Sequence, residues 1–131
     1  MKLKLGKSLL ASALLAVAAA SAALPAVDVK QVSARQSSGA LLIDVREADE
    51  YAQGHAPGST LIPLGQLAQR LQEIARYKDK PVVLICHSGR RSAQALKLLE
   101  GAGFSAAANV EGGMIAWQKA GLPVISGAAS R

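Results

Sequence analysis

The chain has 131 residues, which is enough for one modest domain, and it carries a formal net charge of +6 at pH 7. Three of the basic residues lie within the first seven positions, so that the rest of the chain carries +3. Its remaining basic residues form no long run interleaved with aromatic side chains, which argues against nucleic-acid binding. A mildly basic surface does, however, attract small anions.

The first 22 residues have the three-part layout of a secretory signal peptide. Met1–Lys7 is basic, residues 8–24 are almost wholly apolar or small, and Ala20-Ser21-Ala22 matches an A-x-A cleavage sequence. A transmembrane anchor is the alternative, but it usually needs about 20 apolar residues, and this stretch is slightly short. We therefore expect a signal peptide at residues 1–22, a single domain at residues 23–131, a periplasmic location and no stable membrane association after cleavage.

Strands and helices alternate in the rest of the chain. Short apolar or alternating runs predict strands at residues 26–32, 41–45, 59–62, 82–85 and 104–110. Amphipathic or helix-forming stretches predict helices at residues 46–53, 64–74, 93–100 and 114–120, with a short helix or loop at 33–39. This alternation favours an α/β domain with a parallel sheet.

Cys86, the only cysteine, follows an apolar strand and precedes a polar loop and a helix. The loop N–H groups and the helix N-terminus then surround one point that favours an anion. Arg90 and Arg91 add two cations, and such surroundings lower the pKa of a thiol. A small buried hydrophobe is the alternative, but it does not account for this loop. A lone cysteine in an exported chain cannot form an internal disulfide, which also indicates a reactive thiol.

Asp44 ends its predicted strand, much as Cys86 ends the strand before the polar loop. In open α/β sheets, ligands bind outside the carboxyl ends of the strands. The two side chains are therefore expected to face one crevice.

Other polar residues suggest structural roles. Arg46 and Glu50 are four residues apart within a predicted helix, which indicates a structural salt bridge. His55 lies in a Gly- and Pro-containing turn and is interpreted as a hydrogen-bonding brace. The soft metal ligands Cys86, His55 and His87 lack the paired spacing of zinc sites. We expect neither a metal nor a cofactor.

Several short motifs occur in a fixed order along the chain. They are Asp44-Val45-Arg46-Glu47, Glu50-Tyr51, Gly54-His55-Ala56-Pro57-Gly58-Ser59, Cys86-His87-Ser88-Gly89-Arg90-Arg91-Ser92 and Glu111-Gly112-Gly113-Met114-Ile115-Ala116-Trp117. Together they resemble the rhodanese family, above all its single-domain exported members, over roughly Val29 to Val124. The resemblance implies a rhodanese-like α/β fold with a mostly parallel five-stranded sheet and helices on both faces. It also implies that Cys86 accepts a sulfane sulfur as a persulfide and passes it to cyanide or a thiol.

The loop suits this chemistry. A Cys86 thiolate attacks the outer sulfur of thiosulfate, sulfite leaves, and the backbone N–H groups of residues 87–92 hold the negative charge. Gly89 permits the tight backbone path, and Arg91 or Arg90 holds the sulfonate end of the donor. The candidate site is Cys86 as nucleophile, with the substrate-binding residues His87, Ser88, Gly89, Arg90, Arg91 and Ser92 and the supporting residues Asp44 and Arg46. The expected partners are a small anionic sulfur donor and a thiophilic acceptor, and the expected state is a monomer.

Two alternatives differ in function. A phosphatase or arsenate reductase of this fold needs Cys-x5-Arg, whereas Arg91 stands at Cys-x4-Arg, so that the loop fits a sulfur atom and crowds a phosphate. A rhodanese-like sulfur carrier or partner-binding module that does not itself catalyse transfer stays open, because a carrier would look identical in sequence.

Overall fold

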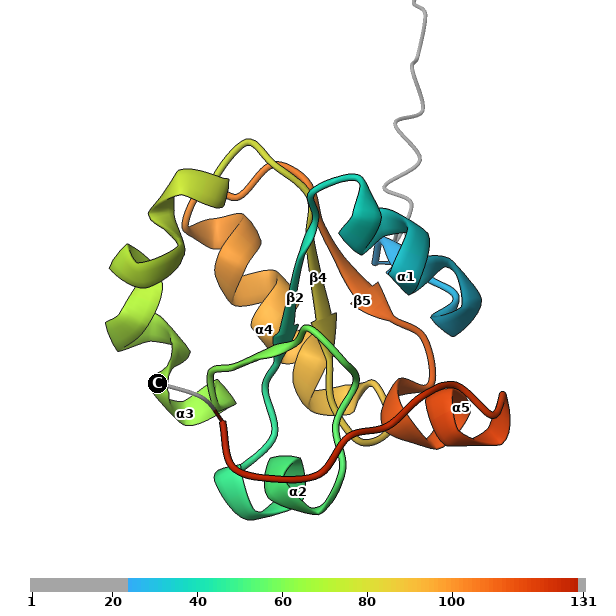
Figure 1. Cartoon of the computed structure of the whole chain (residues 1–131). Helices are drawn as coiled ribbons and strands as arrows, with labels where there is room; N and C mark the ends of the chain where they lie inside the picture. The colour runs from blue at the N-terminus through green and yellow to red at the C-terminus, as the bar shows by residue number, and fades with distance from the viewer. Residues whose placement is uncertain (1–23, 130–131) are drawn as a thin grey trace, which may run out of the picture.

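The computed structural model describes residues 24–129 (Figure 1). The predicted signal peptide lies outside these residues. In chain order the elements are β1 (Ala26–Val27), α1 (Val29–Ser37), β2 (Leu41–Asp44), α2 (Ala48–Gln53), β3 (Thr60–Leu61), α3 (Leu64–Leu67), the 3₁₀-helix η1 (Ala68–Tyr77), β4 (Val82–Ile85), α4 (Arg90–Gly101), β5 (Ala107–Val110) and α5 (Gly113–Lys119). None of the helices described in residues 24–129 is long and apolar enough to span a membrane.

The strands form one five-stranded sheet in the order β1-β5-β4-β2-β3, and all of its pairings are parallel. The central strand β4 pairs with β2 and β5 and is buried along its whole length. A continuous apolar strand of this kind is typical of a sheet covered on both faces. The predicted α/β fold with a parallel sheet is therefore confirmed.

Helices cover both faces of the sheet, as predicted (Figure 1). Val83 and Ile85 of β4 pack in one core cluster with residues of α1 and α5. Val82 and Leu84 point to the other face and pack in a second cluster with residues of α3, η1 and α4. The period of two along the strand thus divides one apolar run between two cores.

The predicted first strand is shorter than expected. Only Ala26–Val27 is strand, because the side chain of Asp28 accepts the backbone N–H of Lys30 at 2.8 Å and caps α1. Val29 and Val32, predicted as alternating strand residues, are instead buried three apart on one helix face. The N-cap aspartate therefore ends the strand at Val27 and starts the helix at Val29.

The segment predicted as one amphipathic helix at 64–74 is a short α-helix followed by the 3₁₀-helix η1. Its apolar face is still buried, through Leu67 and Ile74. Arg70 and Glu73 pair at 2.8 Å on the exposed side. Side chains three apart eclipse one another in a 3₁₀-helix, which suits this pair.

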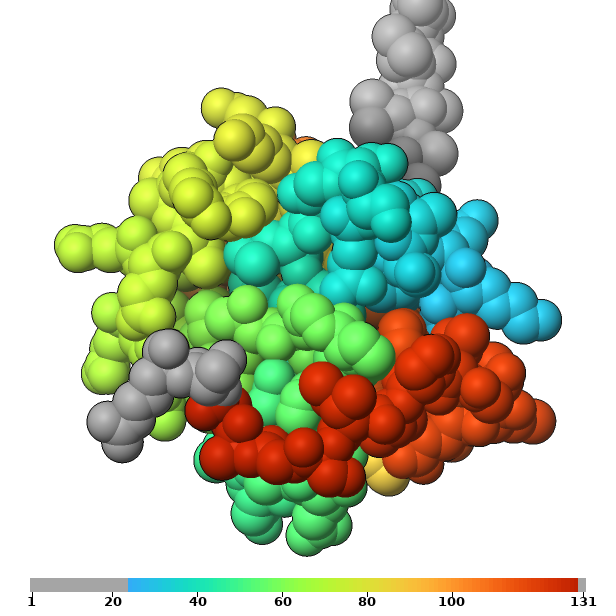
Figure 2. Space-filling view, viewed as in Figure 1, coloured from blue at the N-terminus to red at the C-terminus, as the bar shows by residue number. Residues whose placement is uncertain are grey.

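The C-terminal segment runs back across the surface over α2 and the His55 turn (Figure 2). Ile125 makes an antiparallel bridge with His55, and Gly127 donates its N–H to the carbonyl of Ala52 at 2.9 Å. This segment holds the turn in place near the carboxyl ends of the strands.

Candidate active site

Cys86 lies directly after β4, at the carboxyl edge of the sheet, and its side chain is almost completely buried. The chain then turns through Gly89, whose φ of +101° is the left-handed conformation that glycine adopts without strain. The N–H of Gly89 donates to Cys86 Sγ at 3.1 Å. The sequence therefore places the thiol at the N-terminus of α4, a helix of twelve residues.

The carbonyl groups of the loop are engaged on its outer side. Met114 donates its N–H to the carbonyl of Cys86 at 2.8 Å, and Ile115 donates to that of His87 at 3.0 Å. Gly113 makes this approach possible, since a Cβ at this position would overlap the carbonyl oxygens of Cys86 and His87. With its carbonyls engaged by α5, the loop can aim its N–H groups at the sulfur.

The surroundings of Cys86 favour the ionised form of its thiol. Burial raises the pKa of Cys86, but hydrogen bonds from the Ser92 hydroxyl and from the backbone N–H groups of the loop outweigh burial. The net result is that the pKa of Cys86 lies below its ordinary value. The positive end of the α4 dipole acts in the same direction.

Two residues support the sulfur from the side of β5 and α4. The hydroxyl of Ser92, which is fully buried, lies 3.3 Å from Cys86 Sγ and 2.5 Å from Asn109 Oδ1. Asn109 Nδ2 donates to the carbonyl of Gly89 at 3.1 Å. The sequence analysis did not single out Asn109. The available signal is a polar residue near the end of an otherwise apolar strand, shortly before a Gly-Gly pair.

The predicted Arg46–Glu50 salt bridge is wrong. Glu50 instead accepts two hydrogen bonds from Arg91, at 2.6 and 2.8 Å, across 41 positions of sequence. The Arg91 guanidinium lowers the pKa of Glu50 from 4.5 to about 2, and Glu50 in turn raises that of Arg91. The error has a local cause, because α2 begins only at Ala48 and Arg46 stands before it. Arg91 thus closes the loop through a carboxylate that the sequence analysis assigned elsewhere.

Arg46 and Asp44 form their own buried pair. Arg46 Nη2 lies 2.7 Å from Asp44 Oδ2 and also donates to the carbonyl of Gly54 at 2.9 Å. Asp44 has no exposed surface, so that it does not open into a crevice with Cys86 as expected. It holds Arg46 in place, and Arg46 reaches the rim of the site.

A pocket of about 310 Å³ lies beside the loop. It is lined by Arg46, Glu50, Gln53, Gly54, His87, Met114 and Gln118. His87, Ser88 and Arg90 are exposed on the loop or at the start of α4, so that they face solvent around the buried sulfur. The pocket and these exposed residues form the rim of the candidate site.

His55 acts as the predicted brace. Its Nδ1 lies 2.7 Å from the carbonyl oxygen of Tyr51, and its ring stacks on the Tyr51 ring at 3.6 Å between centroids. With the backbone bridge to Ile125, these contacts tie α2, the turn and the C-terminal segment together.

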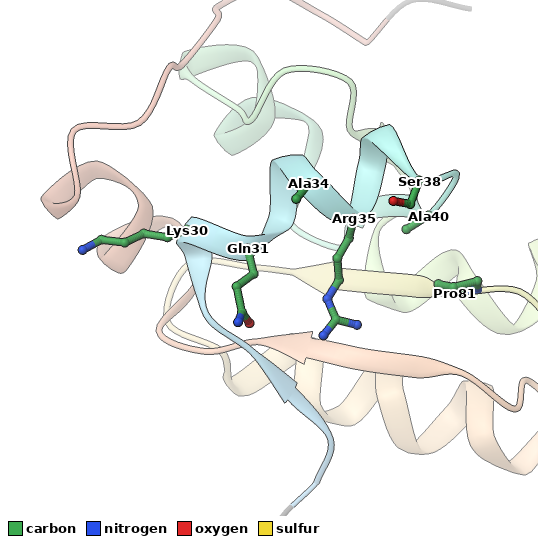
Figure 3. A pocket seen from close by; sticks show the side chains of 7 residues that line it. All are labelled: Lys30, Gln31, Ala34, Arg35, Ser38, Ala40 and Pro81. Carbon is green, nitrogen blue, oxygen red and sulfur yellow. The ribbon is translucent and has the colours of Figure 1, made fainter.

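A larger hollow of about 490 Å³ lies along α1 (Figure 3). Its lining residues are Lys30, Gln31, Ala34, Arg35, Ser38, Ala40 and Pro81. Ala40 and Pro81 precede β2 and β4, so that the hollow reaches the amino ends of these strands, opposite the Cys86 loop. Within the described residues, no three of the His, Cys, Asp and Glu side chains lie close enough to hold a metal ion. We therefore place the candidate site at the Cys86 loop.

Known proteins share both sequence and fold with this chain. A sulfurtransferase of Allochromatium vinosum is 37% identical over 102 residues, which cover 76% of this chain and 94% of the relative. A Bacillus subtilis protein, YrkF, for which a sulfur-carrier role has been suggested, is 41% identical over 76 residues, or 58% of this chain and 40% of that protein.

Solved structures agree with the fold. The thiosulfate sulfurtransferase of Pseudomonas aeruginosa superposes with a TM-score of 0.74 and 28% identity, over 82% of this chain and 21% of that one. A rhodanese-related protein of Thermoplasma volcanium gives a TM-score of 0.69 and 29% identity, over 77% and 97%. The family model named Rhodanese-like domain matches residues 28–120. The chain belongs to this rhodanese-like family of sulfurtransferases and sulfur carriers.

Proposed function

We propose that this protein is a thiosulfate sulfurtransferase that carries a sulfane sulfur on Cys86. The donor is thiosulfate or a similar small anion, and the acceptor is cyanide or a thiol. The observation that carries the proposal is the environment of Cys86 Sγ, which is buried and receives the N–H of Gly89 at 3.1 Å. A thiolate in such a loop is stabilised without a metal or a neighbouring base.

Two displacements at sulfur complete the reaction. In the first, the Cys86 thiolate attacks the outer sulfur of thiosulfate, a new S–S bond forms, and sulfite leaves with the electron pair of the broken bond. In the second, the acceptor attacks the outer sulfur of the persulfide, and the electron pair of that S–S bond returns to Cys86 Sγ. Cyanide leaves as thiocyanate. Preorganised N–H donors stabilise the negative charge at each stage.

The donor's sulfonate needs a cation at the rim. Arg91 donates two of its N–H groups to the Glu50 carboxylate, and the Arg91 side chain is one-third exposed. Arg90 is exposed at the start of α4. We propose that Arg90 and the free N–H groups of Arg91 share the sulfonate, with Arg91 also fixing the loop through Glu50.

Intact mass spectrometry of the purified protein before and after incubation with thiosulfate tests the function. A gain of one sulfur atom that cyanide removes, and that Cys86→Ser abolishes, is expected. If wild-type protein gains no sulfur, thiosulfate is not the donor and the proposal is wrong.

A sulfur carrier loaded by another protein is the second candidate. The observation in its favour is the rim itself, where Ile115 is 49% exposed and lies next to the exposed His87. The suggested role of YrkF points the same way. The two candidates differ in turnover: an enzyme converts excess thiosulfate and cyanide repeatedly, whereas a carrier releases at most the one sulfur that it holds.

We also propose export to the periplasm, on the layout of residues 1–22. Expression of the full chain followed by fractionation and intact mass tests this. Mature protein that begins near residue 23 in the periplasmic fraction is expected, and uncleaved protein in the cytoplasm would contradict it.

A further inference from the structure

The hydroxyl of Ser92 faces two hydrogen-bond acceptors at once. It lies 2.5 Å from Asn109 Oδ1 and 3.3 Å from Cys86 Sγ, and both Ser92 and Cys86 are shielded from solvent. A hydroxyl carries one proton, so that it donates to only one of these atoms at a time. Which one it chooses depends on how the Asn109 amide is oriented.

The structure determines that orientation. The Gly89 carbonyl lies 3.1 Å from the amide of Asn109, and a carbonyl can only accept. The NH₂ end of Asn109 must therefore face Gly89, which leaves Oδ1 facing Ser92. Since Oδ1 also only accepts, the Ser92 proton must lie between the two oxygens, at the short end of the range for O–H···O bonds.

We propose that Asn109 is a positioning residue that holds the Ser92 hydroxyl proton away from Cys86 and releases it when the sulfur becomes an anion. While Cys86 is a thiol, Ser92 donates to Asn109 and turns a lone pair toward the S–H group. The Sγ of a persulfide carries no proton, and Ser92 keeps its bond to Asn109. When the acceptor removes the outer sulfur, the electron pair of the broken S–S bond returns to Sγ. The hydroxyl then rotates and donates to the new thiolate, with no proton leaving Ser92.

The role in transfer rests on the proposed function, whereas the proton arrangement does not. Asn109 weakens the help that Ser92 gives to the thiolate, because donating to sulfur costs the bond to Oδ1. The thiolate is then held by the backbone N–H groups of the loop and by a Ser92 hydroxyl that must first give up its bond to Asn109. Asn109 thus limits the stabilisation that Ser92 gives to the Cys86 thiolate.

Removing the amide need not disturb the loop. The Gly89 carbonyl also accepts the N–H of Ala93 at 3.1 Å, as the first turn of α4. Asn109 is half-buried on β5, where a β-branched residue is well tolerated. Asn109→Val therefore removes both the carbonyl oxygen and the NH₂ of the amide and keeps the strand. The Arg91–Glu50 pair, whose guanidinium interacts with the charge of Cys86, is unchanged in this variant.

The test measures the rate at which iodoacetamide alkylates the reduced protein as a function of pH. Cys86 is the only cysteine, so that the rate reports the thiolate of this residue alone. Four proteins form a cycle: wild type, Ser92→Ala, Asn109→Val and the double variant. Thermal melting of each confirms that it is folded.

Asn109→Val is expected to raise alkylation about fivefold at pH values below the midpoint, since Ser92 can then donate to the thiolate without losing another bond. Ser92→Ala is expected to slow alkylation several times more in the Asn109→Val background than in wild type. Equal effects of Ser92→Ala in both backgrounds would show that the serine donates to sulfur regardless of Asn109, and would overturn the proposal.

Asn109→Asp separates this role from simple support of Gly89. Both variants lose the N–H bond to the Gly89 carbonyl, but the aspartate keeps an acceptor for Ser92 and adds a negative charge. It is expected to slow alkylation where valine speeds it. If both substitutions slow alkylation, Asn109 only supports the loop and the inference is wrong. No thiosulfate is used, so failure here is distinct from failure of wild-type protein to gain sulfur.

Discussion

Replacing Glu50 by Gln removes one charge from the Arg91–Glu50 pair while keeping its shape. The amide oxygen of Gln can still accept the backbone N–H of Glu47, which Glu50 accepts at 3.1 Å. The lowering of the Glu50 pKa from 4.5 to about 2 corresponds to about 3 kcal/mol of stabilisation of the charged form. Because both side chains are about one-third exposed, solvent screening reduces the expected loss of stability to about 1 kcal/mol.

The pH dependence follows from the sign of the shift. A carboxyl group whose pKa is lowered on folding contributes its full stabilisation above the unfolded value of 4.5 and loses it as pH falls toward about 2. Urea unfolding of wild type and Glu50→Gln should therefore differ at pH 7, and the difference should shrink between pH 4.5 and pH 2.

Glu73→Gln is the matched control, because Glu73 pairs with Arg70 at 2.8 Å on the exposed side of η1, away from the loop. We expect this variant to unfold almost as wild type does at pH 7 and to keep the sulfur loading of Cys86. The reasoning is refuted if Glu50→Gln is as stable as wild type at pH 7. It is also refuted if its deficit is the same at pH 7 and at pH 2.

Other substitutions test the remaining supports of the loop. Gly113→Ala should cost about 1–3 kcal/mol in urea unfolding and abolish sulfur loading, since its φ is +54° and its Cβ would overlap two loop carbonyls, whereas Gly65→Ala, with open space around it, should be neutral or slightly stabilising. Asp44→Asn should cost about 3–5 kcal/mol, because it leaves the charge of Arg46 buried without its partner, and the exposed Asp49→Asn should cost little. The lowered pKa of Cys86 predicts that the pH midpoint of alkylation by iodoacetamide lies lower in folded than in urea-unfolded protein, and equal midpoints would contradict it.

The sequence predicts the parts of the site that are adjacent in the chain. Residues 82–101 contain, in order, a strand, a single cysteine, a glycine and a helix. Local conformation alone therefore brings Cys86 to the N-terminus of α4. Gly89 also carries a local signal, since its positive φ marks a turn. These features are recognisable without knowledge of the strand order.

Partners far apart in sequence are a different matter. Glu50 was assigned to Arg46 because four residues separate them, but the helix on which that spacing has meaning begins two residues after Arg46. Glu47 is the N-cap, and Glu50 folds back onto its backbone, which leaves the carboxylate facing Arg91. A helix start misplaced by two positions is enough to exchange one ion pair for another.

Asn109 is placed at the site by strand pairing and register, which the sequence alone does not reveal. In the register of the sheet it stands beside Leu84, two residues before Cys86, so that the neighbouring parallel strand delivers its side chain to the nucleophile. That placement requires knowing that β5 pairs with β4 and in which register, and propensity predicts only a weak strand from the Ala-rich segment. The nucleophile of this site is therefore encoded locally, whereas the groups that govern its proton and its charge are encoded by topology. Variants of Asn109 and Glu50 test the second kind of information.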